Sequence, residues 1–145
     1  MAIFLLLTAN SASAQNVQIT GLVDFNFGTW NVGTTEQASD GVCIHKSGTG
    51  ARTYLVTGTG SGSGGDYTIA SGANELAYTL EWDGGPGGFK SLVPATSKTF
   101  SGASRSQTCN GGTNAEMRIT FDVADLDAAI PGDYSGSLTL LIEPI

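Results

Sequence analysis

Residues 116–123 read Glu116-Met-Arg-Ile-Thr-Phe-Asp-Val123, and apolar side chains occupy every odd position of this run. Charged or hydroxyl-bearing side chains occupy the even positions. Because successive side chains of a β-strand point to opposite faces, this alternation predicts a strand with one buried face.

The same alternation recurs along the chain. The apolar sets are Leu76, Tyr78, Leu80 and Trp82; Val17, Ile19, Val23, Phe25 and Phe27; and Leu138, Leu140 and Ile142. Shorter β-rich runs occur at residues 42–44 and 54–57, and weaker ones at 89–93 and 97–100. Residues 125–130 suit a single helical turn. About seven or eight short, evenly spaced strands predict an all-β sandwich or barrel. Both tryptophans, Trp30 and Trp82, are expected to pack in its core.

The domain organisation follows from length and composition. The 145 residues suit one domain, which we place at residues 15–145. A Gly/Ser run at residues 58–65 resembles a linker, but each flank is too short for a separate core, so we interpret it as a hairpin loop. A phosphate-binding loop would need a helix after the glycines, whereas residues 66–69 suit a strand.

Charge excludes one class of partner. The net charge is −7, and the six Lys and Arg residues are scattered, whereas phosphate backbones attract clustered cations. We therefore expect no binding to nucleic acid. The acidity is expected to serve solubility.

The N-terminus resembles an export signal. Residues 1–14 contain an apolar run followed by Ala12-Ser13-Ala14, the small-residue pattern of a signal-peptide cleavage site. No Lys or Arg precedes the apolar run, which suggests that the signal is truncated at its start; a buried N-terminal strand is the alternative interpretation. No later run approaches the roughly 20 apolar residues of a membrane span, so the chain is not expected to span a membrane.

The two cysteines, Cys43 and Cys109, both lie after the predicted signal. An even number of cysteines in an oxidising compartment predicts a disulfide, which could add roughly 4 kcal/mol of stability. A metal site lacks ligands, because His45 is the only histidine, and a reactive thiol pair would be expected in a CxxC motif.

Candidate catalytic groups are few. His45 lies two residues from Cys43 and is expected to be an exposed strand residue, and no G-x-S-x-G elbow occurs in the context of a hydrolase. Acidic residues gather at Asp122, Asp125, Asp127 and Asp133, but they lack the Gly and Glu of a calcium loop. A solvated loop is the favoured interpretation of that cluster, and weak calcium binding is the alternative. We expect no enzyme activity and no cofactor.

Three segments resemble the pilin-type subunits of the chaperone–usher pathway, in particular its archaic and alternative branch with the spore coat protein U-like domains. They are Val23-Asp-Phe-Asn-Phe-Gly-Thr-Trp30, Leu76-Ala-Tyr-Thr-Leu-Glu-Trp82 and Pro131-Gly-Asp-Tyr-Ser-Gly-Ser-Leu-Thr-Leu-Leu-Ile142. They are similar, respectively, to an F-G-aromatic segment, a strand before a Gly-rich turn, and the terminal strand of those domains. The resemblance spans most of residues 20–143.

The resemblance implies an incomplete immunoglobulin-like sandwich that lacks its final strand. A periplasmic chaperone fills the resulting groove, and an extension of the neighbouring subunit then replaces it during assembly by the usher. By this analogy Leu138, Leu140 and Ile142 line the groove and its edge, and Val17 and Ile19 belong to a possible donor segment. The last predicted strand runs almost to Ile145, so we expect its edge to remain uncovered by any later segment.

The expected function is therefore that of a structural or adhesive subunit of a bacterial surface fibre. Such a protein passes through the periplasm to the cell surface, and a subunit at the tip of the fibre would need no donor segment. The alternative is a self-complete exported β-sandwich that binds carbohydrate or protein.

Overall fold

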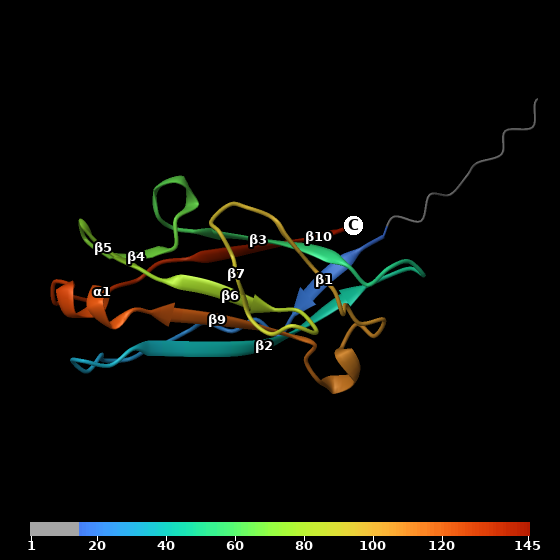
Figure 1. Cartoon of the computed structure of the whole chain (residues 1–145), viewed down its shortest axis with the longest axis horizontal. Coiled ribbons are helices and arrows are strands. Elements are labelled where there is room, and N and C mark those ends of the chain that lie inside the picture. The colour runs from blue at the N-terminus through green and yellow to red at the C-terminus, as the bar shows by residue number, and fades with distance from the viewer. Residues whose placement is uncertain (1–14) are drawn as a thin grey trace, which may run out of the picture.

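The computed structural model describes residues 15–145, so the predicted signal peptide (residues 1–14) lies outside the described residues. The fold is an all-β sandwich of antiparallel sheets, as the sequence predicts (Figure 1). The larger sheet has the order β1 (Val17–Thr20), β2 (Glu36–Lys46), β9 (Ala115–Phe121), β6 (Thr79–Asp83) and β7 (Lys90–Ser91). The smaller sheet has the order β10 (Leu138–Pro144), β3 (Tyr54–Gly60) and β8 (Lys98–Phe100), and β4 (Thr68–Ser71) pairs with β5 (Asn74–Ala77) in a separate ribbon.

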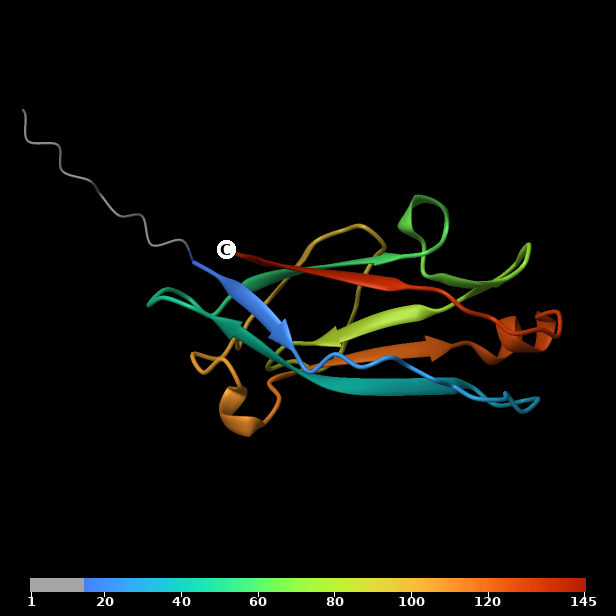
Figure 2. The same ribbon diagram turned by 180° about the vertical axis from the view of Figure 1, so that it is seen from behind.

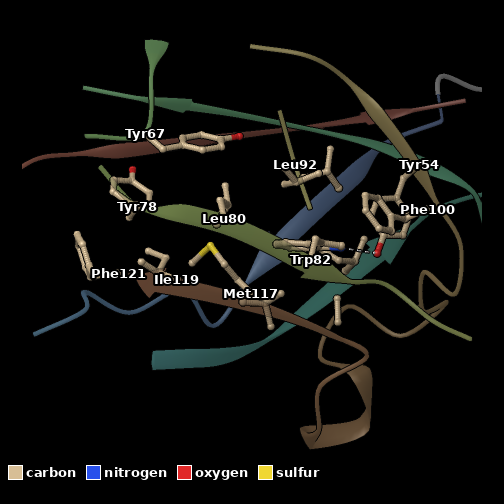
Figure 3. Close-up of a cluster of buried hydrophobic side chains, with 14 of the residues drawn as sticks. Tyr54, Tyr67, Tyr78, Leu80, Trp82, Leu92, Phe100, Met117, Ile119 and Phe121 are labelled. Atoms are coloured by element: carbon tan, nitrogen blue, oxygen red, sulfur yellow. Dashed lines mark hydrogen bonds between the residues drawn. The ribbon is translucent and has the colours of Figure 1, made fainter. Parts of the chain in front are cut away.

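The alternating runs form the core between the sheets. Met117, Ile119 and Phe121 of β9 are buried, and so are Leu76, Tyr78, Leu80 and Trp82, which confirms both predicted faces (Figure 3). The second run is divided at Tyr78, whose amide donates to the carbonyl of Tyr67 (2.9 Å) where the chain passes from the ribbon into the larger sheet. Burial raises the pKa of Tyr67 to about 12, so this core phenol is neutral at physiological pH.

Some predicted elements differ in extent. The first strand ends at Thr20 instead of Phe27, because Gly21 has φ +91° and the chain then leaves the ladder. The run at residues 58–65 is no hairpin loop, since β3 continues to Gly60 and pairs with β8 and β10 instead of with β4. A helical turn is present as α1 (Val123–Ala128), which begins two residues before the predicted range 125–130 and includes Val123 of the predicted strand. Trp82 is fully buried as expected, whereas Trp30 is only partly buried.

A buried hydrogen bond in the core gives a test of this packing. The indole N–H of Trp82 donates to the hydroxyl of Tyr54 (3.2 Å), and both side chains are buried (Figure 3). Tyr54→Phe leaves the indole N–H without an acceptor, so we expect a loss of about 1–3 kcal/mol in the free energy of unfolding, measured in urea. Tyr134→Phe is the matched control, because that hydroxyl bonds to the carbonyl of Ile130 near the surface. Equal losses in the two variants would contradict the prediction.

Candidate functional site

One side of the sandwich is closed by the chain itself. Residues 92–97 cross from β7 in the larger sheet to β8 in the smaller one, and Leu92, the first residue of this crossing, is buried. The ammonium of Lys98 donates to the carbonyl of Ser91 (2.9 Å), and the amide of Ser101 donates to the carbonyl of Gly84 (3.3 Å). Hydrogen bonds therefore join the two sheets on this side.

The opposite side differs, because β10 is the edge strand of the smaller sheet there. Its residues Leu138–Pro144 pair with β3, and just before the strand Ser135 exchanges backbone hydrogen bonds with Ala70 of β4. One edge of this terminal segment is thus paired along its length. Among residues 15–145, no strand pairs with the other edge of β10.

The N-terminal segment lies across from that edge. β1 pairs with β2, and after Gly21 the chain continues along β2 without a ladder, as Figure 2 shows. Side chains hold this continuation: the Phe27 ring meets Phe121 edge to face at 5.0 Å, and the Val23 amide donates to the Asp40 carboxylate (3.2 Å). We call the region between residues 17–30 and β10 the open side.

The predicted groove residues lie on the open side. Leu138, Leu140 and Ile142 are partly buried and pack against the core, whereas Leu141 between them points outward and is 53% exposed. The core is therefore covered incompletely along β10, and β1 of the N-terminal segment lies near this strand.

The predicted donor residues already have partners within the chain. Val17 pairs with Lys46 and Ile19 with Ile44 in the β1–β2 ladder, and both apolar side chains pack on the core. If β1 is to act as a donor for another subunit, it must first leave β2.

The predicted disulfide is confirmed: Cys43 is bonded to Cys109. It fastens the loop before β9 to the Cys43 side chain on the outer face of β2, and the segment at Ser104 runs along the edge of β2, where the Ser104 amide donates to the Ile44 carbonyl (2.7 Å). The prediction for His45 is wrong, because this side chain is buried, with 9% exposed, and not an exposed strand residue. His45 occupies the same outward-facing alternation as Cys43, where the tethered loop lies against β2 and forms a bridge from Ser104 to His45.

The acidic cluster has a local structural role at one position. The Asp122 carboxylate accepts from the Ala124 amide (2.8 Å) and so caps α1, while Asp125, Asp127 and Asp133 are exposed. Within residues 15–145, no three His, Cys, Asp or Glu side chains are grouped so that they could hold a metal ion.

The surface formed by residues 15–145 includes the following two hollows. One of about 150 Å³ lies beside the turn at Gly84–Gly88, and one of about 330 Å³ lies beside the disulfide, between Gly21 and Thr113. Neither of these two hollows includes a residue of β10, and the feature that distinguishes the open side is its unpaired sheet edge. In the part of the chain that the structure describes, no helix has the length and apolar character needed to cross a membrane.

Sequence reasoning missed Lys46, which is 3% exposed and lies at the end of β2 near the open side. Its position continues the inward-facing set Val42 and Ile44, and this period-two spacing was the available signal. The lysine was overlooked because this residue type is rarely buried.

Known proteins provide no assignment: no family model matches the chain, and no match was found among curated proteins.

Proposed function

We propose that this chain is a structural or adhesive subunit of a bacterial surface fibre, assembled by donor-strand complementation. The observation that carries the proposal is the unpaired edge of β10, which lies next to an incompletely covered core. In this proposal a strand from a neighbouring subunit adds to β10 and covers Leu138, Leu140 and Ile142.

The bare edge of β10 is costly for a soluble chain. An unpaired strand exposes a row of N–H and C=O groups and invites aggregation, which proteins usually prevent with charges, prolines or a covering segment. In β10 the only charged residue and the only proline are Glu143 and Pro144, at its end. Strand addition would satisfy the backbone groups and bury apolar side chains at the same time.

The disulfide supports the export that the proposal requires. A disulfide persists in oxidising compartments, which fits an exported protein. The three sequence segments that resemble chaperone–usher subunits support the finer assignment. On that basis the proposed partners are a periplasmic chaperone, an usher and neighbouring subunits, and the proposed destination is the cell surface.

One observation favours the alternative, a self-complete module that binds carbohydrate or protein. The chain's own residues Phe25 and Phe27 pack on the core beside the open side, and β1 is already paired with β2. In this alternative the N-terminal segment gives enough cover, and β10 remains a tolerated edge.

Production in a bacterial periplasm separates the two functions. We expect most copies of residues 15–145, exported without a partner, to aggregate or be degraded, with only a minor fraction recovered as folded monomer, and a co-expressed chaperone of the usher pathway to raise the yield as a soluble one-to-one complex. The measurements are the yield of soluble protein and its mass by size-exclusion chromatography with light scattering. A stable monomer that gains nothing from the chaperone, and that does not bind a synthetic peptide of residues 15–27, would favour the self-complete module.

A further inference from the structure

Lys46 is a buried cation that joins the two sheets at one end of the sandwich. Its ammonium donates to the carbonyl of Thr53 (2.9 Å) and to the main-chain oxygen of Ile145 (2.6 Å). Thr53 directly precedes β3, and Ile145 directly follows β10. A side chain of the larger sheet therefore holds the ends of two neighbouring strands of the smaller sheet.

The end of β10 needs such a contact because its ladder stops there. Pro144 pairs with Tyr54 at the last position of the ladder, so no further backbone pair holds the residue after it. The Ile145 side chain is 55% exposed and gives little packing. Of the described contacts beyond Pro144, the Lys46 ammonium supplies the hydrogen bond that fixes the strand end.

The backbone around Lys46 is hydrogen-bonded on both sides. Its amide donates to the carbonyl of Ser104 (2.9 Å) on one side, and β1 pairs with it through Val17 on the other. The following residue, Ser47, donates to the carbonyl of Asn16 (2.9 Å). The ammonium thus extends from a fixed strand end, and hydrogen bonds from a charged group are stronger than those from a neutral one.

We infer that Lys46 is a positioning residue that holds the end of β10 in register, so that its open edge can accept an added strand. The inference rests on the proposed function for its purpose, but the clamp on β10 can be tested separately. An unclamped edge strand would fray from its end, and an incoming strand would then have to order it on binding, at a cost in affinity.

The first test measures the clamp through amide hydrogen exchange in the folded chain. Lys46→Met keeps the apolar stem and removes the donors, so the amides of Leu141 and Glu143, which face β3, should exchange roughly 30-fold faster. Lys46→Arg, which keeps charge and donors, should restore most of the protection. Ile119→Val in β9 is the control, because it lowers global stability without touching the end of β10. Equal acceleration in Lys46→Met and Ile119→Val would overturn the clamp.

Chemical labelling tests the clamp without any substitution. In the native chain, amine acetylation of Lys46 should be at least about tenfold slower than that of the exposed Lys90, because a buried ammonium is shielded from the reagent. Labelling of Lys46 at the rate of Lys90 would also overturn the inference.

The second test measures positioning with a synthetic peptide of residues 15–27 as the added strand. Lys46→Met should weaken its binding roughly tenfold, while Lys46→Arg and Ile119→Val should bind nearly as the native chain does. If the native chain does not bind the peptide, the proposed function fails while the exchange experiment still decides the clamp. If Lys46→Met frays β10 yet binds the peptide normally, the positioning role is wrong.

Discussion

Replacing Cys43 and Cys109 together by serine is expected to lower the free energy of unfolding by about 4 kcal/mol. The disulfide joins residues 66 positions apart, so it removes much of the conformational freedom of the unfolded chain. The loss should appear as a lower urea midpoint of the double variant, measured against the oxidised native chain. The reduced native chain should unfold close to the double variant, which makes it the matched control.

The native state should also change locally when the disulfide is absent. Cys109 has φ +48° and Asn110 has φ +56°, a left-handed conformation that costs free energy outside glycine. Without the disulfide, the loop loses the covalent constraint that holds Cys109 and Asn110 in this conformation beside β2. We expect faster amide exchange at residues 104–113 and at His45, with little change in β9. A double variant that unfolds within about 1 kcal/mol of the native chain would contradict this account.

The fold class could be predicted because the core strands carry their pattern in consecutive residues. Met117, Ile119 and Phe121 face a fully formed core, and their alternation is correspondingly clear. The strand predicted at residues 42–44 is shorter than β2 (Glu36–Lys46), because the first half of β2 does not face a fully formed core. Its inward positions Ala38 and Asp40 lie toward the incompletely covered part of the core and are only partly buried, so no apolar alternation marks the strand there.

The candidate site could be predicted only in part. Alternation placed Leu138, Leu140 and Ile142 on one face of a strand, whereas their groove role came from the resemblance; the disulfide was predicted from the number of cysteines. His45 and Lys46 could not be placed in this way, because their burial depends on segments distant in sequence: the loop that contains Ser104 and the end of β10. Local patterns report the face of a strand, but they do not report what later covers that face.

Leu140→Lys is expected to abolish strand addition at β10 while leaving the isolated chain folded. Leu140 faces the core beside the open edge and is only partly buried, so a lysine there can direct its ammonium to water in the free subunit. An added strand would block the contact between this ammonium and water, and it would leave an unpaired charge in apolar surroundings. The resulting penalty of roughly 3 kcal/mol corresponds to about a 100-fold loss of affinity.

Leu141→Lys is the matched control, because it places the same charge one residue further along the same edge. Leu141 points outward, so a lysine there remains in water whether or not a strand is added. Binding of the peptide of residues 15–27 should therefore fall steeply in Leu140→Lys and stay within about threefold of native in Leu141→Lys. Urea unfolding of both isolated variants verifies that they remain folded. Equal peptide affinity in the two variants would mean that the incoming strand does not cover the inner face of β10, and the proposed assembly would then be wrong even if the edge itself is used.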